Sequence, residues 1–135
     1  PKCGTTSLHH YLDEHPEIFM PAQKELHFFT NNIISRLNNG PKDAIVKKTQ
    51  INNTEKYLNF YKSVRNEIAI GDASPSYINY PSQFKKIKEY LNDPKVIIIL
   101  RDPIDRAYSN YLHLKREQRE TLTFEEAISA ALSGA

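Results

Sequence analysis

Apolar residues recur at the spacing of a helix face in several separate stretches of the chain. In the first stretch, Leu8, Tyr11 and Leu12 lie on one face of a helix that we expect over residues 5–14. The same spacing predicts further helices over residues 54–64, 82–91 and 103–119, and a last helix is expected over residues 123–133. Helices should therefore make up a large part of the fold.

Several boundaries of these helices carry their own signals. His15-Pro16 ends the first helix, and Pro103 stands where a later one begins. Thr123 and Glu126 have the spacing of a capping box, which predicts the start of the last helix. These signals place polar loops directly before helix N-termini.

Short apolar runs between the helices predict strands. Residues 18–20 and 68–70 are strand candidates, and the second is expected to be buried and to end at Gly71. Residues 96–100 are five consecutive aliphatic residues, typical of a strand buried on both faces of a parallel sheet, and we expect the central strand here. Residues 24–30 fit either a strand or an extended turn.

The least regular part of the chain is the polar stretch 31–53. It carries Asn38-Asn39-Gly40-Pro41 and is predicted to be mostly loop, with a short helix around residues 33–37. Strands that alternate with helices elsewhere indicate a single α/β domain with a central parallel sheet flanked by helices. Ligands of such sheets bind at the carboxyl ends of the strands.

Composition and charge exclude several classes of function. The 18 basic and 16 acidic side chains are spread along 135 residues, without the dense basic stripe that nucleic-acid binding needs. The single cysteine, Cys3, and the scattered histidines do not have metal-ligand spacing. The longest aliphatic run is far shorter than the roughly 20 residues of a membrane span. We expect no nucleic acid, metal or membrane segment.

The opening residues have the character of a phosphate-binding loop. Lys2, Gly4 and the hydroxyl residues 5–7 stand at the start of the first helix, where backbone N–H groups and the helix dipole favour an anion. The loop lacks the Walker pattern, because its lysine precedes the glycine. The alternative interpretation is a Thr or Ser cap on an ordinary helix.

A second polar cluster follows the predicted central strand. Arg101 and Ser109 together suit a phosphate monoester, because a guanidinium forms forked, charge-assisted hydrogen bonds. The alternative is an ion pair that stiffens this turn, either Arg101–Asp105 or Asp102–Arg106.

The ordered pair of motifs, PKxGTTSL and RDPxxRAxSxY, resembles the two signatures with which sulfotransferases bind 3′-phosphoadenosine 5′-phosphosulfate (PAPS). Residues 24–29 and 71–77 are similar to segments of the heparan sulfate N- and 3-O-sulfotransferase branch and its bacterial relatives. The resemblance implies a P-loop-containing nucleotide-binding fold. It also implies a PAPS-dependent sulfotransferase that acts on a hydroxyl or amine, with a carbohydrate as the favoured acceptor and PAP as the product.

The resemblance also implies roles for individual residues. Glu25 would be the catalytic base, and Lys2 would neutralise charge on the departing nucleotide. Binding of the donor nucleotide would fall to Lys2, Gly4, Thr5, Thr6, Ser7, Arg101 and Ser109. Ala73 departs from the pattern, since the heparan enzymes usually carry a lysine at this position. No metal is expected, because a sulfuryl group carries less charge than a phosphoryl group.

Other side chains near these motifs have two interpretations. His27, Asp72 and Ser74 would contact the acceptor or support the residues that do, or they have structural roles only. Glu25 has an alternative as a surface carboxylate paired with Lys24 or Lys47. Two other functions stay open: a P-loop nucleotide kinase or NTPase, and a non-catalytic nucleotide-binding module.

Residues 1–135 are interpreted as a partial sulfotransferase domain. The resemblance implies a strand before Pro1 and a basic, glycine-containing segment after Ala135, and without them this piece should be inactive. A bacterial cytosol is the favoured location, and a Golgi lumen is the alternative if a membrane anchor lies upstream.

Overall fold

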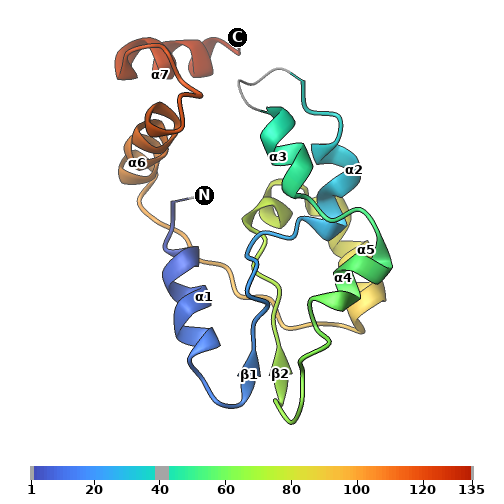
Figure 1. Ribbon diagram of the computed structural model, residues 1–135. Helices are drawn as coiled ribbons and strands as arrows, with labels where there is room; N and C mark the ends of the chain where they lie inside the picture. The colour runs from blue at the N-terminus through green and yellow to red at the C-terminus, as the bar shows by residue number, and fades with distance from the viewer. Residues whose placement is uncertain (1, 39–42, 135) are drawn as a thin grey trace.

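The computed structural model describes residues 2–38 and 43–134 (Figure 1). The first half contains α1 (Thr5–Asp13), β1 (Ile18–Phe19), the 3-10 helix η1 (Phe28–Thr30), α2 (Asn31–Ile34), α3 (Asp43–Thr49) and α4 (Thr54–Asn59). The second half contains β2 (Ala69–Ile70), the 3-10 helices η2 (Pro75–Asn79) and η3 (Pro81–Gln83), α5 (Phe84–Leu91), α6 (Pro103–Arg116) and α7 (Phe124–Ser133). The five helices expected from the sequence are confirmed, although α4 and α6 end earlier than predicted.

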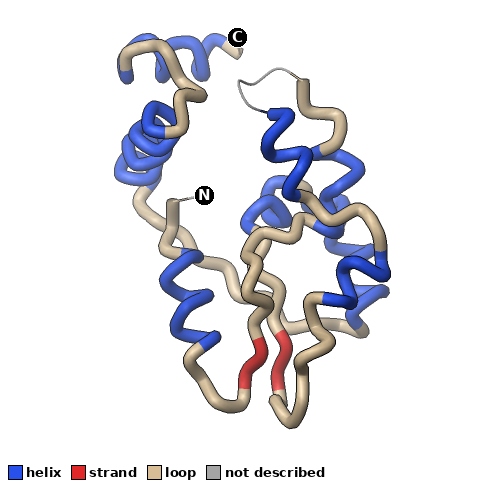
Figure 2. Tube along the Cα trace, in the orientation of Figure 1, coloured by secondary structure: helices blue, strands red, loops and turns tan. Residues whose placement is uncertain are grey.

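A small parallel sheet joins two distant parts of the chain. β1 and β2 pair in parallel, with Ile18 opposite Ala69 and Phe19 opposite Ile70, and they lie side by side in Figure 2. Both strands were expected, and so was their parallel direction. The expected burial of the second strand is wrong, because Ile70 is 57% exposed.

The prediction of a central strand over residues 96–100 is also wrong. This stretch is coil in Figure 2, and the side chains of Ile97 and Leu100 are 67% and 76% exposed. A strand exists only where a neighbour supplies hydrogen bonds, and the two strands of the described residues pair with each other. Aliphatic composition alone therefore does not make this segment a strand.

The hydrophobic core lies between η1, α4 and α5. Phe28 stacks on Tyr57 with ring centroids 4.2 Å apart, and Phe29 is fully buried beside them. Leu26 and Ile87 complete the buried cluster. This core fixes the segment just before η1, which is the segment that carries Glu25.

The stretch 31–53 is more helical than its composition suggested. α2 overlaps the expected short helix, whereas α3 lies where loop was predicted. Asp43 is in the first turn of α3 and Lys47 and Lys48 are in its last turn, which suits the helix dipole. The Asn39-Gly40-Pro41 part of the turn signal lies outside the described residues.

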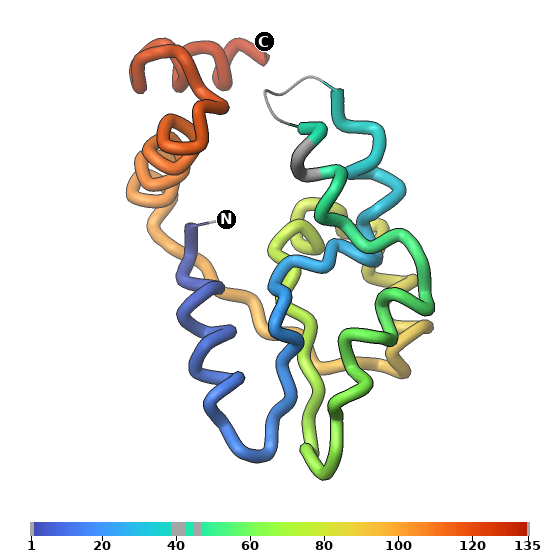
Figure 3. Tube along the Cα trace, viewed as in Figure 1, coloured from blue at the N-terminus to red at the C-terminus, as the bar shows by residue number. Residues whose placement is uncertain are grey.

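The final two helices form an arm that packs through aromatic rings. Asp102 caps α6 by accepting hydrogen bonds from the N–H groups of Ile104 and Asp105. Thr123 and Glu126 form the expected capping box at the start of α7. Figure 3 shows this arm, in orange and red, beyond the start of α1.

A search of the described residues for a helix long and apolar enough to cross a bilayer finds none.

Candidate functional site

The loop before α1 leaves the first backbone N–H groups of the helix without a side-chain cap. Gly4 is the N-cap residue and has φ 86°, a left-handed conformation that suits glycine. A Cβ atom at Gly4 would meet nothing within 4 Å, so the backbone is open on this side. The first turn of α1 carries no acidic residue. The alternative of a Thr or Ser cap is wrong for this N-terminus, and its N–H groups are open to an anion.

The structure brings the second basic cluster to this loop. The guanidinium of Arg101 donates to the backbone oxygen of Lys2 at 3.5 Å, across 99 residues of chain. Arg101 also lies 3.8 Å from the carboxylate of Asp105, as the structural alternative expected. Asp102 caps α6 instead of pairing with Arg106. The guanidinium of the second motif therefore lies at the backbone of the first motif.

Ser109 does not join this cluster by a direct contact. It lies inside α6 and is partly buried. Its hydroxyl makes no hydrogen bond to another described residue. Its role in phosphate binding stays a prediction.

Glu25 lies close to the phosphate loop through Lys24. The ammonium of Lys24 lies 2.7 Å from Glu25 Oε1 and donates to the hydroxyl of Thr5 at 3.4 Å. Lys24 and Lys47 were the two ion-pair partners considered for Glu25. Glu25 pairs with Lys24, whereas Lys47 donates a hydrogen bond to Asn38. The side chain of Glu25 is 46% exposed, so the carboxylate is partly open to solvent. Lys24 was not among the predicted site residues, although it stands next to Glu25 in the sequence.

The backbone around Glu25 is strained. Glu25 and His27 have φ values of 63° and 54°, in a region that costs residues with a side chain about 1–3 kcal/mol each. The strain is held by two hydrogen bonds: the N–H of Glu25 donates to the oxygen of Ala73 at 3.1 Å, and the N–H of His27 donates to Ser74 Oγ at 3.2 Å. The segment 71–77 thus fixes where the Glu25 carboxylate lies.

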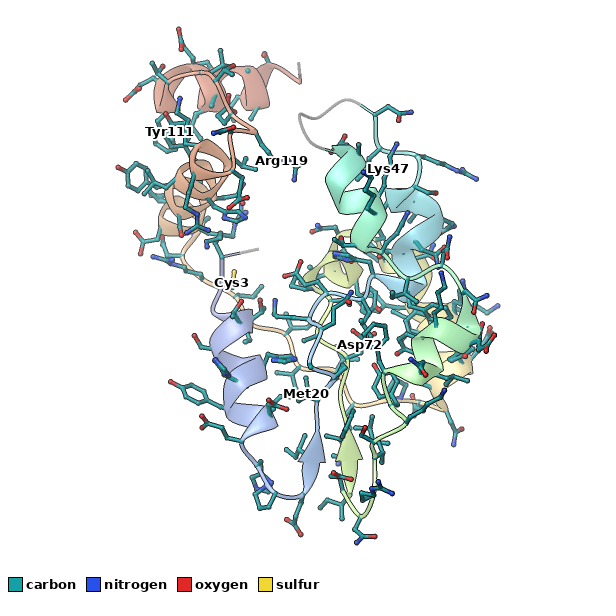
Figure 4. All side chains as sticks on the ribbon, viewed as in Figure 1. Cys3, Met20, Lys47, Asp72, Tyr111 and Arg119 are labelled. Carbon is teal, nitrogen blue, oxygen red and sulfur yellow. The ribbon has the colours of Figure 1, made fainter. Side chains whose placement is uncertain are left out.

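Asp72 organises a polar network behind Glu25, and Figure 4 shows it in the middle of the molecule. Its carboxylate accepts hydrogen bonds from Ser74 at 2.7 Å, Tyr77 at 2.7 Å and Tyr57 at 3.2 Å. Burial, together with the charge of Asp72, raises the pKa values of both tyrosines, so they stay neutral donors. Asp72 and Ser74 therefore hold the backbone of the segment that carries Glu25, and neither side chain contacts Glu25 directly.

His27 is buried beside Glu25. Its Nδ1 lies 2.8 Å from Ser76 Oγ, and its Nε2 lies 3.6 Å from Glu25 Oε2, too far for a hydrogen bond. Burial lowers the pKa of His27, against the opposing effect of Glu25 and Asp72. The ring is therefore neutral near pH 7, and it contacts both the core and the candidate base.

An open cavity of about 600 Å³ is lined by the first turn of α1 and by the segment that carries Glu25. It is large enough for a small ligand. Its lining residues come from three segments: Thr6, Gln23, Lys24, Glu25, His27, Lys48, Thr49 and Ile51. Thr6, Glu25 and His27 were predicted site residues. Lys48, Thr49 and Ile51 were missed, because no local pattern indicates that the stretch 31–53 folds back onto the Glu25 segment.

Residues 1–133 match the model of the sulfotransferase family. The chain belongs to the sulfotransferase family. A solved relative is a sulfotransferase from Alicyclobacillus acidocaldarius, with 40% identity and a TM-score of 0.89 over 96% of this chain and 52% of that one. The resemblance inferred from the two motifs is confirmed, and the small parallel sheet with its helices is part of a sulfotransferase-family fold.

Curated relatives cover most of this chain. Membrane-associated sulfotransferase kil1 of Dictyostelium discoideum is 36% identical over 82% of this chain, and carbohydrate sulfotransferase 15 of Mus musculus is 30% identical over 98%. This chain covers 20% and 29% of those proteins. The mouse bifunctional heparan sulfate N-deacetylase/N-sulfotransferase 4 is 28% identical over 87% of this chain, which supports the heparan branch of the resemblance.

Proposed function

We propose that the whole protein is a sulfotransferase that uses PAPS as its donor and a hydroxyl or amine as its acceptor. The observation that carries this proposal is the meeting of three groups at the start of α1. They are the uncapped glycine loop, the guanidinium of Arg101 on the Lys2 backbone, and the Lys24–Glu25 pair bonded to Thr5. A strand-loop-helix nucleotide site of the P-loop type is proposed on the same grounds.

The donor would bind along the loop. Backbone N–H groups at Gly4 to Thr6 and the side chain of Lys2 would hold the 5′-phosphosulfate, since helix N-termini and a nearby cation stabilise anions. Arg101 and Ser109 would hold the 3′-phosphate. The fit rests on the open backbone at Gly4 and on the position of Arg101 beside Lys2.

In the transfer of the sulfuryl group, one bond to sulfur would break and another would form. The bond from sulfur to the bridging phosphate oxygen breaks, a bond from sulfur to the acceptor oxygen or nitrogen forms, and PAP leaves with the electron pair. Glu25 takes the acceptor proton, and Lys2 stabilises the negative charge on the leaving oxygen. The partly exposed side chain of Glu25, which lines the cavity, supports this role. The protein's contribution is mainly alignment and charge stabilisation.

A carbohydrate is the proposed acceptor class. The support is the size and partly polar lining of the cavity beside Glu25, together with the carbohydrate and heparan sulfate named for two relatives. The experiment is a transfer assay with the full-length protein, sulfur-labelled PAPS and a panel of oligosaccharides. We expect labelled sugar and PAP in equal amounts. PAPS consumption without a sulfated product in any acceptor class would contradict the proposal.

A further inference from the structure

The cavity next to Glu25 has a wall that the family motifs do not supply. Lys48 and Thr49 at the end of α3, and Ile51 just after it, line this cavity together with Thr6 of α1. They belong to the stretch that matched the motif pattern least. This wall is therefore a place where this protein can differ in what it binds.

Three hydrogen bonds hold that wall against the Glu25 segment. Gln23 Nε2 donates to the backbone oxygen of Thr49 at 3.3 Å, and the N–H of Ile51 donates to the oxygen of Leu26 at 2.9 Å. Asn31 Nδ2 donates to the oxygen of Ile51 at 3.3 Å. Because these bonds flank Glu25 on both sides in sequence, the end of α3 has a fixed relation to the candidate base.

The charges on the cavity lining do not balance. Lys24 and Glu25 neutralise each other at 2.7 Å, and His27 is neutral near pH 7. Lys48 makes no hydrogen bond or ion pair with any described residue. Among the described lining residues it is the cation without a counter-charge.

We propose that Lys48 selects acceptors that carry an anionic group, a carboxylate or a sulfate, near the hydroxyl or amine that receives the sulfuryl group. Glu25 would contact the reacting group, and Lys48 would pair with the anion across the cavity. The inference rests on the proposed sulfotransferase function. It adds that the acceptor is negatively charged and that Lys48 is the residue that recognises this charge. An ammonium at an open cavity gives a modest attraction, so the effect is selectivity rather than an absolute requirement.

The test compares two acceptors that differ only in charge. One is a uronic-acid oligosaccharide, and the other is the same oligosaccharide with its carboxylates reduced to alcohols. In the full-length protein, Lys48→Ala should raise KM for the carboxylated acceptor about fivefold and leave KM for the reduced acceptor within about twofold. Lys48→Arg should restore the preference, and KM for PAPS should not change.

Lys47→Ala is the matched control. Lys47 is the neighbouring lysine of the same helix, but it does not line the cavity and donates to Asn38 at 2.6 Å. It should leave the ratio of the two KM values unchanged. An equal loss for both acceptors after Lys48→Ala would overturn the inference, because it would indicate a structural role. A rise in KM for PAPS alone would also overturn it, since the cation would then serve the donor.

Calorimetry separates this inference from the proposed function. Binding of both oligosaccharides to the PAP-loaded protein gives the same comparison without turnover. If no sulfate is transferred but Lys48→Ala weakens only the carboxylated ligand, the sulfotransferase proposal fails and the role of Lys48 stands. If sulfate is transferred and the Lys48→Ala variant binds both oligosaccharides with the same affinity as the unmodified protein, Lys48 has no such role.

Discussion

The backbone N–H of His27 donates to the hydroxyl of Ser74 at 3.2 Å, across 47 residues of chain. The hydroxyl of Ser74 in turn donates a hydrogen bond to the carboxylate of Asp72 at 2.7 Å. One buried hydroxyl thus connects the strained segment that carries Glu25 to a carboxylate held by two tyrosines. The position of the candidate base depends on residues that do not touch it.

Ser74→Ala should destabilise the protein. The N–H of His27 would lose its acceptor in a buried place, which costs about 1–3 kcal/mol. Urea unfolding of the full-length protein measures the change. Ser82→Ala is the control, because Ser82 is exposed and accepts only a 3.4 Å bond from Gln83. Equal unfolding free energies for the two variants would show that the Ser74 bond contributes nothing.

Glu25→Gln should separate chemistry from donor binding. The amide cannot take the acceptor proton, so kcat should fall by roughly 10²–10⁴. PAP binding, measured by calorimetry, should stay near that of the unmodified protein. If kcat is unchanged, Glu25 is not the base; if PAP binding is lost as well, its pairing with Lys24 matters for the loop itself.

Removing the two cations of the donor site should weaken PAP binding. Lys2→Ala and Arg101→Ala should each lower the affinity about 10-fold or more, the size expected for a lost hydrogen bond to a charged group. Lys62→Ala, an exposed lysine outside the site, is the control. Calorimetric titration with PAP measures the affinity of all three variants. Unchanged binding after both site substitutions together would remove the basis of the proposed function.

His27 should make stability depend on pH. Burial lowers its pKa from 6.5, with Lys24 acting in the same direction and Glu25 and Asp72 against it. The unfolded chain therefore binds the proton first, so the contribution of His27 is complete above its unfolded pKa and is lost as pH falls through that value toward the folded pKa. Urea unfolding at about pH 7.5 and about pH 5.5 should show a smaller difference for His27→Gln than for the unmodified protein. A larger difference would mean that the folded protein favours the charged ring.

The ion pair between Arg119 and Asp43 should link the C-terminal arm to α3. Arg119 donates to Asp43 at 2.8 Å, and both side chains are mostly buried; Figure 4 shows Arg119 on the side of the arm that faces α3. A double-mutant cycle with Asp43→Asn and Arg119→Gln should give a coupling of about 0.5–3 kcal/mol. The single variants also perturb neighbouring contacts, and the cycle removes those contributions. A coupling near zero would mean that the arm and α3 are held together by other groups.

Local signals in the sequence were sufficient for much of the fold. The capping box at Thr123 and the apolar faces of α1 and α5 are decided by residues three or four positions apart, so the sequence alone indicates them. α3 was missed because it is only seven residues long. Short helices have little intrinsic stability, so packing decides them.

The sequence by itself determined the family, and it singled out the loop at residues 2–7 and Glu25 as candidate site residues, because the motifs that carry them are runs of neighbouring residues. Only the tertiary structure decided that Arg101 reaches Lys2, that Lys24 pairs with Glu25, and that Lys48 lies on the cavity wall. It also decided against a strand at residues 96–100. The physical reason is the same in each case. A strand or a site needs a partner from a distant part of the chain, and only the folded structure shows which segment becomes that partner.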